Sequence, residues 1–399
     1  MSTSSPEERF YHRTFALGFL YNFLHGLMFS NNSLFPLYVE FSGGGPDTIG
    51  LFMGLFLFAA VLGRPIQGAL IDHYGARWVM LLATACLGLP YVGYWLFLDQ
   101  GLAAPVWVLR AIQGFGWGAH MSAFFTLVGQ VAPANRRNEA IAKYGMAGMI
   151  GSAFGPYAGE TVIVFLGWSW FFVLLFVVGV LAWSTAAAIE KPKTDVAAQT
   201  FSPASAWAVL KSSRFALASF FALCHAASLG AVVNYLSPVM TERGISSFTL
   251  FFTAYSASGV AIRLLGSHWG DRHGYAYVLV PGFLFYGSGL TLIQFSHNLP
   301  VLVIAGLICG TAHGLLFPII TTLGYVFAPA DKRGTGVALI TGMMDVGNGL
   351  SALILGWAAY LMNYEIVFIL GPIPAFCAVV VTLATAGVLH RERARLAET

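Results

Sequence analysis

The sequence GRPIQGALIDHYGAR (Gly63–Arg77) returns in altered form as RLLGSHWGDRHG (Arg263–Gly274). An Arg, an Asp and a Gly recur at one offset of 199 residues, which pairs Arg64 with Arg263. Both copies are short charged segments that lie between long apolar runs. The chain therefore contains one loop twice, and we expect it to consist of two similar halves.

The composition predicts that the flanking runs lie in a membrane. Of the 399 residues, 57% are hydrophobic and 9% are charged, with a mean hydropathy of +0.74. Soluble proteins carry roughly 25% charged residues, so water is not the main solvent of this chain. The runs are continuous rather than alternating, which favours helices over the strands of a membrane barrel. We predict an all-α membrane protein.

Twelve apolar runs are separated by loops that contain charges, Gly or Pro. Each is long enough to cross a lipid core about 30 Å thick. We expect helices at 14–38, 48–71, 78–97, 104–131, 138–166, 168–190, 214–240, 246–269, 275–296, 299–327, 334–361 and 365–389. These helices would form two pseudo-symmetric six-helix bundles.

Further repeats support the two bundles. His25 recurs as His225 at an offset of 200, and Gly114 recurs as Gly310 at an offset of 196. We expect a cytoplasmic N-terminal tail over 1–13, an N-terminal bundle over 14–190, a cytoplasmic linker over 191–213, a C-terminal bundle over 214–390 and a cytoplasmic C-terminal tail over 391–399.

Lysine and arginine residues predict the orientation. If the N-terminus is inside, 18 of the 20 fall on the cytoplasmic side, as the positive-inside rule requires. We therefore expect a multi-pass protein of the inner (plasma) membrane with both termini in the cytoplasm.

Three segments carry a family resemblance. They are the loop Gly63–Arg77, the segment LRAIQGFGWGA (Leu109–Ala119) and the segment GMAGMIGSAFGPYAGE (Gly145–Glu160). Together with the repeat, they resemble the major facilitator superfamily of secondary transporters, and in particular its proton-driven exporters of drugs and metabolites. The resemblance implies a substrate site near the midplane between the two bundles.

The resemblance also assigns roles to residues. It implies a conformational latch that comprises Gly68, Asp72, Arg77, Asp271 and Arg272. It implies an antiporter gate motif that comprises Gly151, Gly155, Pro156 and Gly159, although Glu160 stands where a second Gly is usual. Small residues at four-residue spacing allow close helix packing.

Candidate proton-coupling residues are Arg110, Asp345 and Glu160. The resemblance links Arg110 to proton coupling, although it alternatively snorkels to the outer interface. An acid in a cavity takes up a proton near neutral pH, so Asp345 is the first candidate, with a structural hydrogen bond or an ion pair with the charged loop as the alternative. Glu160 alternatively faces an outer vestibule or pairs with Arg110.

Four histidines fall in the runs that line the central cavity in this superfamily. Imidazole suits proton exchange or ligand binding, but a membrane histidine is also a common packing residue. The candidate substrate-binding residues are His25, His225, His313, His120, Asn22, Gln113, Trp117, Asn234 and Tyr235. This lining is polar, aromatic and almost uncharged, which favours an amphipathic or weakly anionic organic substrate.

The leading interpretation is a proton-coupled antiporter that exports a small amphipathic compound by alternating access. Alternatives are an importer or facilitator of an organic acid or sugar, or a lipid flippase. An enzyme is not expected, because neither a phosphate-binding GxxxxGK[ST] loop nor a di-iron histidine box occurs. The expected partners are a small molecule, protons and the lipid bilayer, without nucleic acid, cofactor or metal, and the chain is expected to work as a monomer.

Overall fold

The computed structural model describes residues 13–131, 137–189, 203–266, 269, 274–329 and 332–397. These residues form helices and short connections, without a strand. Each of the twelve expected runs is helical, which confirms the all-α prediction. The chain separates into two compact units, and each is described by itself.

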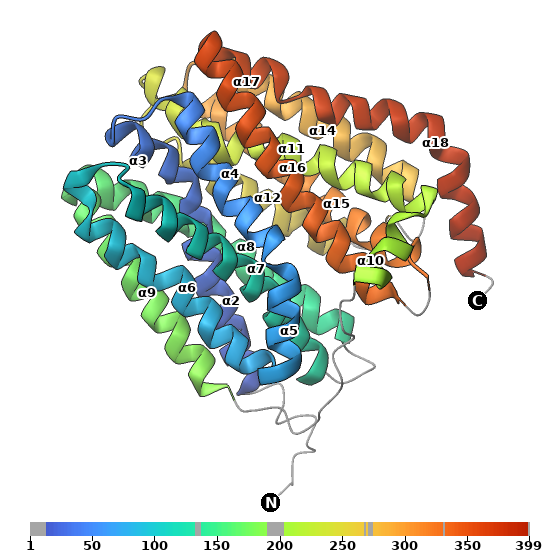
Figure 1. Ribbon diagram of the computed structural model, residues 1–399. Helices are drawn as coiled ribbons and strands as arrows, with labels where there is room; N and C mark the ends of the chain where they lie inside the picture. Colours follow the sequence, from blue (N-terminus) through green and yellow to red (C-terminus); the bar gives the residue numbers. More distant parts are fainter. Residues whose placement is uncertain are drawn as a thin grey trace, which may run out of the picture. The chain divides into compact units, whose positions relative to one another are not determined.

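Unit 1 comprises residues 1–34, 41–43 and 55–201. Its helices are α2 (Thr14–Ser30), the last part of α4 (Pro46–Leu62), α5 (Arg64–Tyr74), α6 (Ala76–Leu96), α7 (Ala104–Val131), α8 (Arg137–Leu166) and α9 (Trp168–Ala188), with the short 3-10 helix η2 (Leu98–Gln100). α2 packs along α8 and α9, and α6 packs against α7 and α9 (Figure 1).

Unit 2 comprises residues 35–40, 44–54 and 202–399. Its helices are α3 (Phe35–Phe41), the first part of α4, α10 (Pro203–Leu210), α11 (Ser213–Glu242), α12 (Leu250–Gly266), α14 (Tyr275–Gln294), α15 (Leu299–Val326), α16 (Arg333–Leu361), α17 (Glu365–Leu370) and α18 (Ile373–Ala397). α11 packs along α16, and α15 packs against α12 and α14 (Figure 1).

The unit boundary crosses the expected N-terminal bundle, because Phe35–Glu40 and Gly44–Gly54 cluster with unit 2. Glycines explain this packing. A Cβ atom at Gly50 would meet the backbone oxygen of Ala352, and one at Gly54 would meet the side chain of Leu353. The first part of α4 thus lies directly against α16.

Eight helices are long and apolar enough to cross a membrane, and nine are if the bent pair α4 and α5 counts as one span. This number covers the described residues only, and α12 is a shorter apolar helix. The pair bends by 46° where α5 begins at Arg64 and Pro65. Proline lacks a backbone N–H, so it is tolerated in the first turn and interrupts the preceding ladder. The chain is a multi-pass membrane protein.

The first expected helix is also interrupted, by the 3-10 helix η1 (Asn31–Leu34). Polar side chains there bond to carbonyls one turn back, and Asn31 Nδ2 donates to the oxygen of Leu27 at 2.7 Å. Asn32 Nδ2 donates to the oxygen of Phe29 at 2.9 Å. Such bonds compete with the helical ladder and stabilise its end. The break fixes the position of Asn32 in the interior of unit 1.

Candidate transport site

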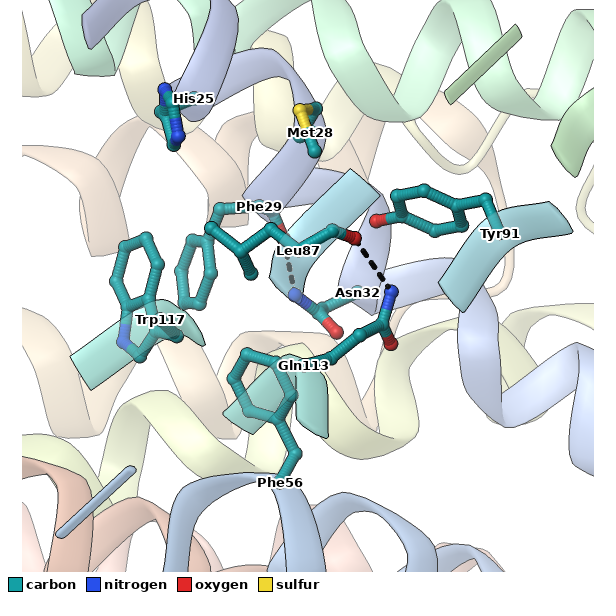
Figure 2. Close-up of a pocket in the computed structure, with 9 residues that line it drawn as sticks. All are labelled: His25, Met28, Phe29, Asn32, Phe56, Leu87, Tyr91, Gln113 and Trp117. Atoms are coloured by element: carbon teal, nitrogen blue, oxygen red, sulfur yellow. Dashed lines mark hydrogen bonds between the residues drawn. The ribbon is translucent and has the colours of Figure 1, made fainter. Parts of the chain in front are cut away.

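A small cavity lies inside unit 1 (Figure 2). It is lined by His25, Met28, Phe29, Asn32, Phe56, Leu87, Tyr91, Gln113 and Trp117. The rings of Phe29 and Trp117 stack with centroids 3.7 Å apart and planes within 10°. In this conformation the cavity has room for about one water molecule, and its wall combines aromatic rings with amide and imidazole groups.

Arg110 is fully buried beside this cavity. Its Nη1 donates to Asn32 Oδ1 at 2.8 Å and lies 3.4 Å from Gln113 Oε1, and its guanidinium lies 4.5 Å from the ring centre of Phe56. Gln113 Oε1 also accepts from the hydroxyl of Tyr94 at 2.8 Å. The predicted alternative, in which Arg110 reaches the outer interface, does not describe this conformation.

The amide groups beside Arg110 have little freedom to rotate. The Nδ2 of Asn32 bonds to Phe29, and the Nε2 of Gln113 donates to the oxygen of Leu87 at 3.2 Å (Figure 2). Because the oxygen of each amide faces Arg110, both amides are held at their two ends. Arg110 thus positions two polar groups of the cavity wall.

His25 and His120 form a stacked pair in unit 1. Their ring centroids lie 3.9 Å apart with an angle of 2° between the planes. His25 Nδ1 lies 3.0 Å from the backbone oxygen of Tyr21, and His120 Nδ1 lies 3.0 Å from the Tyr21 hydroxyl. Thr84 Oγ1 connects the two sides, 3.2 Å from both His25 Nε2 and the Tyr21 hydroxyl. The pair is therefore part of one closed, buried network.

His225 and His313 form the corresponding pair in unit 2. Their centroids lie 5.0 Å apart, and the ring of Tyr286 lies 5.4 Å from that of His225. Both ring nitrogens of His225 are buried without a hydrogen-bond partner among the described residues, as is Nδ1 of His313. The sequence predicted one role for both pairs, whereas their surroundings differ.

The remaining predicted substrate residues bond within the protein. Asn22 Nδ2 donates to the oxygen of Tyr144 at 2.6 Å in unit 1. In unit 2, Asn234 Nδ2 donates to Asn348 Oδ1 at 3.0 Å, and the hydroxyl of Tyr235 donates to the oxygen of Ala352 at 2.5 Å. Of the nine predicted residues, His25, Gln113 and Trp117 line the cavity.

The predicted acids lie on two helices. Glu160 lies near the end of α8 and Asp345 lies within α16, and both side chains are partly buried. Neither lines the cavity of unit 1.

The predicted latch is only partly described. Arg77 donates to the backbone oxygen of Ala187 at 2.6 Å, so its charge lies at the C-terminal end of α9, where a cation is favourable. Asp72 is exposed at the end of α5, and Gly68 is partly buried on the same helix. No ion pair joins Asp72 to Arg77 among the described residues. Asp271 and Arg272 lie outside them.

The predicted gate motif packs α8 on α2. A Cβ atom at Gly151 would collide with the backbone oxygen of Phe23, and one at Gly155 would collide with Ser30. A Cβ atom at Gly159 would likewise collide with the side chain of Asn31. Pro156 is buried inside α8. The four-residue spacing therefore creates one smooth face of α8 that packs closely on α2.

Sequence reasoning missed two groups. Thr84 joins the histidine network, but a single Thr in an apolar run gives no signal. In unit 2, the hydroxyl of Tyr364 donates to Glu40 Oε1 at 2.5 Å. Burial raises the pKa of Glu40, and nearby Glu242 adds to that rise, while the Tyr364 bond opposes it. Glu40 follows the expected helix 14–38, where an acid looked like an ordinary loop charge.

The sequence profile described as Major Facilitator Superfamily matches residues 17–264 and 227–398, which together span nearly the whole chain. The Multidrug resistance protein MdtG of Escherichia coli O9:H4 (strain HS) is 28% identical over 374 residues, covering 88% of each chain. Multidrug resistance protein 3 of Bacillus subtilis (strain 168) is 27% identical over 141 residues, but the match spans only 27% of that protein and 35% of this chain.

Solved structures share the fold. The human organic anion transporter MFSD10 (TETRAN) matches with a TM-score of 0.67 at 19% identity, covering 95% of this chain and all (100%) of that one. The nucleoside transporter NupG, solved as a mutant, matches with a TM-score of 0.74 at 14% identity, covering 94% of this chain and 99% of that one. The chain is a transporter rather than an enzyme, and it belongs to the major facilitator superfamily.

Proposed function

We propose that the chain is a proton-coupled antiporter that exports a small amphipathic organic compound by alternating access. Relatives named for multidrug resistance support export. The observation that carries the proposal is that His25 lies in the cavity wall and also in the buried hydrogen-bond network. Substrate and proton thus meet at one side chain. We place both termini in the cytoplasm and the chain in the inner membrane.

The buried network around His25 has fewer polar hydrogens than hydrogen-bond contacts. A carbonyl oxygen only accepts, so His25 Nδ1, facing the oxygen of Tyr21, carries a hydrogen. Thr84 Oγ1 lies 2.8 Å from the oxygen of Met80 and gives its one hydrogen to it. The contact between Thr84 Oγ1 and His25 Nε2 then receives a hydrogen only if Nε2 itself carries one.

The Tyr21 hydroxyl does not repair this shortage. It has one hydrogen and two contacts, with Thr84 Oγ1 and with His120 Nδ1. If it donates to Thr84, His120 Nδ1 donates back to Tyr21, and every contact except that of His25 Nε2 is satisfied. One added proton on Nε2 completes the network.

The stacked pair limits the network to a single added charge. Two imidazolium rings 3.9 Å apart would repel strongly in a low-dielectric interior. Burial opposes even one charge, because the ring loses its hydration. A proton held in this way is released readily when substrate in the cavity alters the surroundings of His25. We propose that His25 exchanges the proton and that Arg110 positions the amide groups of Asn32 and Gln113. We propose that Asp345 and Glu160 carry the proton along other parts of its path.

Transport into liposomes tests the proposal. Norfloxacin is a suitable probe, because it is amphipathic and fluorescent. We expect a pH gradient to drive its movement through the purified chain, with a matching change in lumenal pyranine fluorescence. His25→Asn should abolish the dependence on the gradient, whereas His297→Asn, which changes an exposed histidine, should not. Norfloxacin movement that is identical with and without the gradient would overturn proton antiport.

A further inference from the structure

A polar cluster in the interior of unit 2 has no part in the proton network of unit 1. It comprises His225 on α11, Tyr255 and Arg263 on α12, Tyr286 on α14 and His313 on α15. The rings of His225 and His313 lie 5.0 Å apart, and those of Tyr255 and His313 lie 5.4 Å apart. Four helices thus converge on one group of donors.

The cluster is buried but not satisfied. His225 is 1% exposed, yet neither of its ring nitrogens has a hydrogen-bond partner among the described residues. His313 Nδ1 and Arg263 Nε are also buried without one. Buried polar groups are nearly always paired, and an unpaired one costs free energy. A histidine that only packs would be bonded as His25 is.

The chemistry of the cluster selects the missing partner. Arg263 adjoins His313 across the ring of Phe317, which lies 5.4 Å from the Arg263 guanidinium and 5.6 Å from the ring of His313. Guanidinium, imidazole and phenol groups all donate hydrogen bonds, and a cation among them favours an anion as the acceptor. The described residues contain no group of three His, Cys, Asp or Glu side chains that could hold a metal ion.

We propose that this cluster binds the carboxylate of a small aromatic acid. The carboxylate accepts from Arg263 and from the histidines, and the aromatic body packs on Phe317, whose ring lies 5.4 Å from the Arg263 guanidinium and 5.6 Å from the ring of His313. His225 and Tyr286 are fully buried, whereas Arg263, Tyr255 and His313 are partly exposed and mark the side of approach. The proposal rests on the transport function above and specifies the substrate class.

Benzoate and its neutral analogue benzamide test the proposal on the full chain in detergent. Calorimetric titration at constant ionic strength should show that benzoate binds at least about tenfold more tightly, as one charge-assisted hydrogen bond would give. Arg263→Gln should remove this preference. Arg64→Gln should keep it, because Arg64 is the repeat-related residue of unit 1. Equal affinity for benzoate and benzamide in the unaltered chain would overturn the proposal.

A second variant and two competing ions serve as controls for the benzoate experiment. If Arg263→Gln does not elute as a single species, His225→Asn is the second variant, and a preference retained there contradicts the assignment. Competition titrations with sodium chloride and with inorganic phosphate test whether the cluster binds any anion. If either inorganic ion competes for the cluster as strongly as benzoate does, the assignment of an aromatic acid as the ligand is overturned. If the unaltered chain shows no preference for benzoate while gradient-driven norfloxacin movement persists, this inference fails and the proposed function stands.

Discussion

The two histidine pairs occupy related helices but have opposite surroundings. In unit 1, His25 and His120 are held by Tyr21 and Thr84 in a closed network. In unit 2, both nitrogens of His225 lack partners among the described residues. The sequence repeat therefore preserves the positions of the histidines but not their hydrogen-bond partners. A network short of one proton suits proton exchange, and a group of unpaired donors suits a bound anion.

The largest effect is expected where the helix faces of the two units differ. At the offset of 196, Gly155 of α8 corresponds to Ser351 of α16. Gly155→Leu should reduce folded protein severely, because its Cβ would already meet the backbone oxygen of Leu27 at 2.5 Å. Overpacking of this kind costs about 3 kcal/mol or more. Ser351→Ala is the control in unit 2, with a smaller loss of melting temperature, because a Cβ atom is already accommodated there and only the hydroxyl bond to Ala227 is removed. Similar losses would show that α8 and α16 pack alike.

Thr84→Val should break the network of unit 1. The shape is kept, but His25 Nε2 and the Tyr21 hydroxyl each lose a partner. Orphaned buried groups cost about 1–3 kcal/mol, so the melting temperature in detergent should fall by several degrees and proton coupling should be lost. Thr185→Val is the matched control, since the Thr185 hydroxyl bonds within its own helix, to the oxygen of Leu181. Coupling that survives Thr84→Val would contradict the proton count.

His225→Leu should have the opposite effect on stability. Its nitrogens lack partners among the described residues, so an apolar replacement removes a penalty instead of creating one. We expect a melting temperature that is unchanged or slightly raised, together with loss of benzoate preference. His25→Leu, measured in parallel, should be destabilising. If both variants lose equal stability, the two pairs have the same surroundings.

The smallest effect concerns Glu40, which bonds to Tyr364 in unit 2. Its pKa is raised mainly by burial, so the folded chain binds this proton more tightly than the unfolded chain does. Stability from this group is therefore full at low pH and is lost as pH rises through the raised pKa. Glu40→Gln should flatten that dependence and shift the melting temperature at pH 7 upward by no more than about 2 °C. A steeper dependence in the variant would contradict the sign.

The fold was largely predictable because lipid imposes a simple rule. Each crossing needs a continuous apolar run, and α7 (Ala104–Val131) coincides with the expected range 104–131. The break at Asn31–Leu34 was not predictable from hydropathy, because it depends on side chains that bond back to their own carbonyls. The association of Gly44–Gly54 with unit 2 depends on glycine contacts that only three dimensions show.

The candidate site was predictable in residue type but not in detail. An Arg inside an apolar run indicated a buried cation, and the structure buries Arg110 fully. The sequence could not show that Asn22 and Asn234 bond within the protein, since an amide side chain gives the same signal in a cavity wall or a helix contact. It also could not separate His25 from His225, because their difference lies in the neighbouring residues.

Proton release in detergent tests the central claim most directly. Norfloxacin is added at saturation to the purified chain in weakly buffered solution with a pH indicator. At a pH low enough for His25 Nε2 to carry the added proton, the proton count predicts release of up to about one proton per chain, none from His25→Asn, and an unchanged amount from His225→Asn. Release that persists in His25→Asn and disappears in His225→Asn would contradict the assignment of the proton to unit 1.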